Sequence, residues 1–360
     1  GASFGAETRK SGDDNKDKDA TYITQPENEV SAKNKQLWQN LKTIEKSETL
    51  TGPNLIGSLK EKKERVFYTY KKMPHFKDGE WTAWDNTVSV NDSSGLSNDY
   101  LILVQLHETI HALQTMNKLL QDNPSWSIYD YQREIFSVEA SARVGAGLFA
   151  LELMQDSVNG PWQELDKSPF DETSYILSAW NEACKDSTSY RDALEKAGAT
   201  LFYQQLSVQW WLDGYNNNIL AGYIELVVEG EMGDPGIGDQ YGIDKIRKTG
   251  YLSPEFNFTS RVDSVPAGQF LFGSNVRMRQ AFEYAEAFRI AETLGEDSPE
   301  YIALEKKMKA DNNPYLGLDL AQVHEAHLLF KDDIRMLQVM DSFVEQRQKK
   351  MQKNTPSPKQ

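Results

Sequence analysis

The chain has 360 residues, 39% of them hydrophobic and 26% charged, and its 54 acidic and 39 basic side chains give a net charge of −15. This length predicts one large domain or two closely associated ones. The acidic balance argues against a nucleic-acid partner, because binding to phosphates needs clustered Lys and Arg. The single cysteine excludes an internal disulfide framework and a cysteine-based zinc cluster. No apolar run reaches the roughly 18 residues of a membrane span, so no membrane-spanning segment is expected.

The two ends of the chain are polar. Residues 1–31 are charged and poor in aliphatic side chains, so we predict a disordered tail there and a second, basic one at 349–360. The chain starts without Met and with a polar stretch, which favours an exported bacterial protein that has lost a signal peptide.

Strand patterns are confined to the first third of the chain. Residues 32–49 carry apolar side chains at helical spacing. Residues 65–70 and 81–90 are rich in β-branched and aromatic residues and are bounded by Gly, Asp and Asn, which predicts two strands. Ser97 then provides an N-cap for a long apolar helix that begins near Asp99 and is predicted to be buried.

The rest of the chain is predicted to be mostly helical. A helix over 129–155 is rich in Ala and Gly, which allows close packing on another helix. Apolar periodicity predicts further helical segments at 171–196, 199–229, 276–294, 298–310 and 318–347, with a loop at 230–242. Cys184 is expected to be a small buried side chain. The predicted fold is therefore mainly α with a small N-terminal β-sheet.

The long buried helix carries His107, Glu108 and His111, which match the pattern H-E-x-x-H. Residues four apart lie on one face of a helix, so both imidazoles can reach one metal ion, and Glu108 lies beside them. Zn²⁺ suits these ligands, because it lowers the pKa of its bound water to about 7 and polarises a substrate carbonyl. With only five histidines in the chain, a chance match is improbable.

A catalytic zinc site needs a third protein ligand. Glu139 is the best candidate, because it lies 28 residues after His111 on the next helix and is followed by small residues that permit close approach. Glu134 is the alternative, but five residues around a helix separate the two by about 140°, so both cannot face the metal. Glu152 is farther along the helix and is expected to be solvated.

Several other polar residues have both structural and functional interpretations. His324 and His327 share a helix face, and we favour a packing pair over a second ligand pair or a donor to an oxyanion. Tyr215 and Tyr223 are candidates for such a donor, and the sequence does not choose between them. His75 is expected to be exposed.

Two residues one turn beyond the candidate ligands have possible roles in organising the site. Gln114 can orient a ligand, and Arg143 can pair with a carboxylate, either Glu108 or a substrate terminus.

The strings HETIHALQ (107–114) and VEASA (138–142) resemble H-E-x-x-H-A-x-Q and E-A-x-A of a group of bacterial metallopeptidase domains in the gluzincin branch of the zincins. The resemblance covers about 65–150. It implies a zinc-dependent peptidase acting on a peptide or protein substrate, with His107, His111 and Glu139 binding Zn²⁺ and Glu108 as general base.

The same resemblance implies a domain organisation. A zincin-like catalytic core is expected at 32–160 and a helical domain that completes the cleft at 161–348. It also implies that residues 81–90 form an edge strand that pairs with the substrate.

Two other functions share parts of this pattern. A di-iron carboxylate bundle needs Glu-x-x-His on two helices, and no second histidine has Glu three residues before it. A non-catalytic binding protein on a zincin scaffold remains the alternative. The sequence indicates neither the identity of the substrate, nor endo- against exopeptidase action, nor the oligomeric state.

Overall fold

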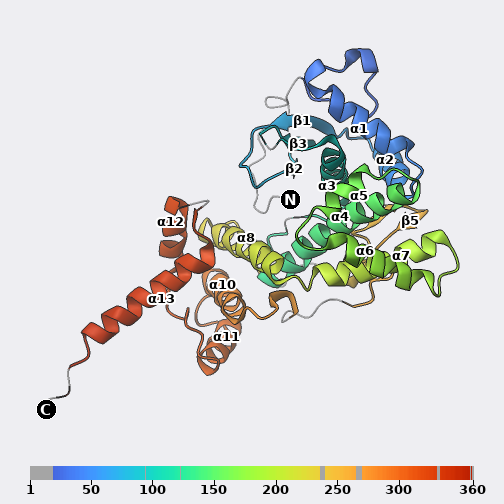
Figure 1. Ribbon diagram of the computed structural model, residues 1–360. Coiled ribbons are helices and arrows are strands. Elements are labelled where there is room, and N and C mark those ends of the chain that lie inside the picture. Colours follow the sequence, from blue (N-terminus) through green and yellow to red (C-terminus); the bar gives the residue numbers. More distant parts are fainter. Residues whose placement is uncertain are drawn as a thin grey trace.

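The computed structural model describes residues 19–93, 95–121, 123–235, 240–264, 270–330, 333–356 and 358. Within them the fold is mainly helical with a small sheet, as predicted (Figure 1). The helices are α1 (Lys35–Lys46), α2 (Thr51–Glu61), α3 (Asn98–Met116), α4 (Ile128–Gln155), α5 (Gly160–Asp166), α6 (Glu172–Cys184), α7 (Tyr190–Gln205), α8 (Gln209–Val228), α9 (Ile243–Ile246), α10 (Val276–Leu294), α11 (Pro299–Ala310), α12 (Leu320–Phe330) and α13 (Met336–Lys353). Among the described helices, none combines the length and apolarity that crossing a membrane requires.

The N-terminal sheet has the strand order β1-β3-β2, with β1 (Phe67–Lys71) parallel and β2 (Gly79–Thr82) antiparallel to the central β3 (Thr87–Asn91). The single strand predicted at 81–90 is wrong, because a turn with Asn86 in the left-handed region (φ 52°) splits it into β2 and β3. β3 is paired on both sides, so only the β2 part of that segment lies at an edge of the sheet.

Helices α3 and α4 pack directly on each other, and small residues on α4 make this possible. A Cβ atom placed on Gly145 would lie 2.5 Å from Ile110 Cδ1 and 3.0 Å from the Phe258 ring. The prediction that small residues permit close approach is therefore confirmed at this position.

The buried apolar residues form two clusters, and α4 belongs to both. The first half of α4, including Ile135 and Phe136, shares a cluster with residues of α8, α10, α12 and α13. Its second half shares the other cluster with residues of the sheet, α1–α3, α6 and α7. Figure 1 accordingly shows α1 and α2 at one end of the molecule and α13 at the other. The division of the chain at residues 160 and 161 stays a prediction.

Several predicted helical segments are broken in the structure. Residues 171–196 contain the whole of α6 and the first turns of α7, where Ser189 caps α7 by accepting from the Asp192 amide. Residues 318–347 contain α12 and most of α13. Cys184, at the end of α6, is exposed, so its predicted burial is wrong.

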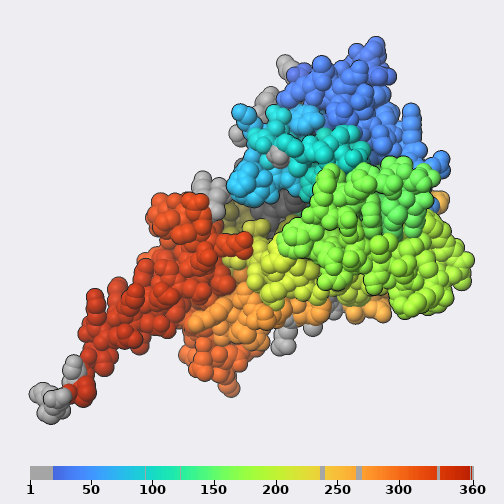
Figure 2. All heavy atoms as spheres, viewed as in Figure 1, coloured from blue at the N-terminus to red at the C-terminus, as the bar shows by residue number. Residues whose placement is uncertain are grey.

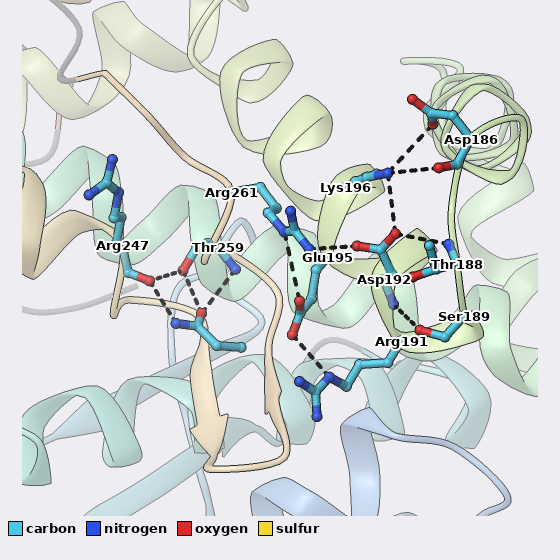
Figure 3. Close-up of polar contacts among 11 residues, drawn as sticks. Asp186, Thr188, Ser189, Arg191, Asp192, Glu195, Lys196, Arg247, Thr259 and Arg261 are labelled. Atoms are coloured by element: carbon cyan, nitrogen blue, oxygen red, sulfur yellow. Dashed lines mark hydrogen bonds and ion pairs between the residues drawn. The ribbon is translucent and has the colours of Figure 1, made fainter.

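A short hairpin outside the N-terminal third was not predicted. It consists of β4 (Tyr251–Ser253) and β5 (Phe256–Asn257). Figure 3 shows the polar contacts around the segment that follows it: Arg261 pairs with Asp192 of α7 at 2.6 Å, and Thr259 donates to the carbonyl oxygen of Arg247 at 2.8 Å. The first contact ties this segment to α7, and the second joins it to the residues just before the hairpin.

The ordered part of the chain extends beyond both predicted limits. Thr21 is buried and exchanges two backbone hydrogen bonds with Tyr68 of β1, so the prediction of disorder up to residue 31 is wrong for residues 19–31. Residues 1–18 lie outside the described residues. At the other end α13 continues to Lys353, so residues 349–353 are helical rather than a tail.

Candidate metal centre

The helix that carries the H-E-x-x-H pattern is fixed at its start by a side-chain cap. Ser97 accepts a hydrogen bond from the Tyr100 amide at 3.2 Å, as the sequence predicts. From Leu101 to Gln114 nearly every side chain of α3 is buried. His111 is completely buried, and His107 keeps 23% of its side chain exposed.

Three ligand-type side chains meet between α3 and α4. One donor atom each from His107, His111 and Glu139 lies within 4.8 Å of the others, a grouping that can hold a metal ion. Oε2 of Glu139 is 3.5 Å from Nε2 of His107 and 3.2 Å from Nε2 of His111. The ring centroids of the two histidines lie 4.9 Å apart with an interplanar angle of 79°, so the rings do not stack. Both Nε2 atoms face Oε2 of Glu139.

The pKa shifts at this centre follow from its burial and its charges. Desolvation lowers the pKa of His107, which favours the neutral imidazole that binds metals. Burial alone would raise the pKa of Glu139, but the adjacent imidazoles of His111 and His107 hold it well below its usual range. Glu139 is therefore an anionic oxygen donor at neutral pH.

Gln114 fixes the orientation of His111. Its amide nitrogen donates to the carbonyl oxygens of Val138 (3.2 Å) and Thr249 (2.9 Å), which turns its oxygen toward His111 Nδ1 at 2.8 Å. In the neutral imidazole the hydrogen then lies on Nδ1, and the lone pair of Nε2 faces Glu139. The predicted orienting contact of Gln114 is present.

The other two glutamates of α4 lie elsewhere. Glu134 accepts from the Gln121 amide at 2.8 Å, on a different side of the helix from Glu139. Glu152 is buried rather than solvated, because it accepts from the amides of Leu50 (2.7 Å) and Thr51 (3.1 Å). Its carboxylate caps the start of α2, and that explains why a charged side chain is buried there.

Glu108 lines a large cavity beside His107. The cavity has a volume of about 1090 Å³, and its wall comes from β2, α3, α4 and the α5–α8 region. Figure 2 shows the parts of the chain that supply this wall, the cyan segment with the strands and the green to yellow-green segment of α4–α8. A Cβ atom on Gly79 of β2 would lie 3.3 Å from Glu108 Cγ, so the edge strand passes directly against the carboxylate-bearing residue.

Tyr215 of α8 completes the group around the cavity. It lines the cavity, and burial together with the nearby charges of Glu139 and Glu108 raises its pKa. Tyr223, eight residues later, instead donates to Glu286 and has no place in the cavity wall. Nothing in the sequence distinguishes Tyr215 from Tyr223, because the partner of each is set by a distant helix: Glu139 of α4 for Tyr215 and Glu286 of α10 for Tyr223.

Arg143 and the remaining histidines lie around this centre without joining it. Arg143 lines the cavity and is paired with Glu172 rather than with Glu108. His324 and His327 border a second cavity of about 340 Å³, which shares Tyr215 and Asn218 with the first. His75 is exposed, as predicted.

Comparison with known proteins identifies a family. No curated protein and no solved structure matches the chain. A family model described as "Putative metallopeptidase family (DUF6782)" matches residues 16–224, which is more than half of the chain and includes His107, Glu108, His111, Glu139 and Tyr215. The chain therefore belongs to this metallopeptidase family.

Proposed function

We propose that the protein is a zinc-dependent metallopeptidase that hydrolyses peptide bonds. The observation that carries the proposal is the convergence of His107, His111 and Glu139 within 4.8 Å, beside Glu108, at the wall of a cavity large enough for a peptide. Membership of a metallopeptidase family supports it independently.

The residues present fit a catalytic zinc ion. Two imidazole nitrogens and one carboxylate oxygen form a typical donor set for catalytic zinc, which leaves a further position for water. The Nδ1 contact of His111 with Gln114 leaves Nε2 available as a ligand. When bound, the ion supplies a Lewis acid and lowers the pKa of a water molecule.

Two side chains of this protein would then move or hold protons. Glu108 is 3% exposed and borders the cavity, where its carboxylate can take a proton from the attacking water and pass it to the leaving amine. The Tyr215 hydroxyl, which is protonated at neutral pH, can donate a hydrogen bond to the oxygen on which charge develops.

The first test measures metal content. Glu139→Gln should lose the metal, whereas Glu134→Gln should keep it, because a glutamine there retains an acceptor for the Gln121 amide. Equal metal content in these two matched variants would contradict Glu139 as a ligand.

The second test measures cleavage of a peptide library. Glu108→Gln should bind zinc in the same stoichiometry as the unmodified protein and lose cleavage, because the amide cannot accept the proton. A protein with stoichiometric zinc and no Glu108-dependent cleavage would be the alternative, a binding protein on a zincin scaffold. A protein that binds no metal would contradict the zinc-dependent peptidase.

A further inference from the structure

Exposed aromatic side chains gather in the cavity that holds Glu108 and His107. Phe76, Phe170, Tyr175 and Trp210 line it, with exposed fractions of 71%, 48%, 51% and 50%. Phe170 lies in the loop between α5 and α6, and Trp210 lies in the first turn of α8. Their rings stack with centroids 4.6 Å apart and an angle of 27°.

Such a grouping is unusual on a protein surface. A large aromatic side chain buries about 150–250 Å² when it is fully covered. Several such side chains left half-exposed together therefore lose stabilisation that burial would provide. The other exposed aromatic side chains among the described residues, Tyr190, Phe270 and Phe330, line neither of the two cavities described above. The concentration in one cavity indicates a ligand that covers these rings.

The charged residues of the same wall already have partners in the protein. Arg143 pairs with Glu172, and Lys77 pairs with Glu80 at 2.7 Å. Asp78, also in the wall, accepts from the Tyr100 hydroxyl at 2.8 Å. A charged substrate side chain would have to displace one of these contacts, whereas an apolar one would only displace water from the rings.

The stacked rings line the same cavity as His107 and Glu108. Trp210 and Tyr215 are five residues apart on α8, which is a rise of about 7.5 Å along the helix axis and about 140° around it. An extended peptide advances about 3.3–3.6 Å per residue, so a peptide of a few residues covers this separation. Trp211, between them, packs against Tyr215 with ring centroids 5.1 Å apart and keeps this part of α8 fixed.

We propose that Phe170 and Trp210 form an aromatic platform that binds a large apolar or aromatic side chain of the peptide substrate, within a few residues of the bond that is cleaved. This inference rests on the proposed peptidase function and specifies its substrate class. Tyr175 and Phe76 extend the apolar surface toward α6 and the β1–β2 loop.

The test compares cleavage of peptides that differ only in one residue, Phe, Leu, Ala or Lys, placed at each of three positions on either side of the cleaved bond. The unmodified protein should prefer Phe or Leu at one position. Phe170→Ala and Trp210→Ala should each lower kcat/KM about 10-fold more for the preferred peptide than for the Ala peptide. Trp210→Phe should keep most of the preference.

Phe270→Ala is the matched control, because Phe270 has nearly the same exposed fraction as Phe170 (46% against 48%) and lies outside the cavity wall. It should leave the preference unchanged. A preference that survives both platform variants, or that Phe270→Ala abolishes equally, would overturn the inference while leaving Glu108-dependent cleavage intact.

Failure of the peptidase function is detected separately. If no peptide is cleaved, binding of the Phe and Ala peptides is measured by calorimetry on Glu108→Gln with and without Trp210→Ala. Tighter binding of the Phe peptide that depends on Trp210 supports the platform even then, and equal binding overturns it.

Discussion

Gln114 offers a sharp test of the metal centre, because it touches a ligand without being one. Its side chain is 2% exposed and makes three hydrogen bonds, to His111 Nδ1 and to the carbonyl oxygens of Val138 and Thr249. Gln114→Ala removes all three. We expect this substitution to weaken metal binding and to destabilise the fold.

The size of both effects follows from these contacts. Each hydrogen bond contributes about 1 kcal/mol net, so the free energy of unfolding should fall by about 3 kcal/mol, and by more if the buried carbonyl groups find no water. Loss of the partner that orients a metal-bound imidazole typically weakens metal affinity about 10- to 100-fold. Both values are large enough to measure.

Gln105 provides the matched control. It is also a fully buried glutamine of α3, where it accepts from Asn40 at 2.7 Å and donates to the Leu37 carbonyl oxygen at 3.0 Å, but it does not contact His111. Gln105→Ala should lower stability by a comparable amount and leave metal affinity unchanged. Urea unfolding of the metal-free proteins gives stability, and zinc titration against a competing chelator gives affinity.

The orienting role of Gln114 is refuted if Gln114→Ala binds zinc as tightly as Gln105→Ala does. It is also refuted if both variants lose affinity equally, because loss of stability would then account for the effect.

Three further predictions address packing, catalysis and pH dependence. Gly198→Ala should lower the free energy of unfolding by about 1–3 kcal/mol, because the new Cβ would meet the Phe258 carbonyl oxygen. Gly214→Ala has open space around it and should raise the free energy of unfolding by about 0.5–1 kcal/mol. Urea unfolding that gives both changes the same sign would contradict this. Tyr215→Phe should lower kcat about 100-fold with little change in KM, and an unchanged kcat in steady-state assays would exclude the hydroxyl as a donor. Burial raises the pKa of Glu152 above the ordinary 4.5, so the folded state binds more protons than the unfolded state and stability falls as pH rises through the raised pKa. The stability difference between Glu152→Gln and the unmodified protein should therefore shift in favour of the variant as pH rises from the ordinary carboxyl pKa through the raised one in urea unfolding, and a difference that is independent of pH would show that Glu152 does not titrate in this way.

The sequence predicted well what depends on short-range helical geometry. The shared face of His107 and His111 follows from a spacing of four, and the angle between Glu134 and Glu139 follows from a spacing of five. The structure brings His107, His111 and Glu139 together and places Glu134 against a different backbone amide. Their roles as metal ligands stay a prediction.

What the sequence could not predict depends on contacts between distant segments. Tyr215 and Tyr223 lie on one helix and differ only in what faces them, Glu139 in one case and Glu286 in the other. Glu152 is buried because the start of α2, about 100 residues earlier, donates to it. The hairpin strands β4 and β5 have only three and two residues, too few to show an alternating pattern.

The hydrogen bond from Gln114 to the Thr249 carbonyl oxygen has a consequence for how such a site changes over evolutionary time. Residue 249 lies beyond residues 16–224, the segment that the family model matches, and the atom that it contributes belongs to the main chain. A main-chain acceptor places no demand on the identity of the side chain, so this support can persist while position 249 drifts. Pattern searches would overlook it, and a fragment that stops at residue 224 would retain every proposed ligand while losing part of what holds His111 in place.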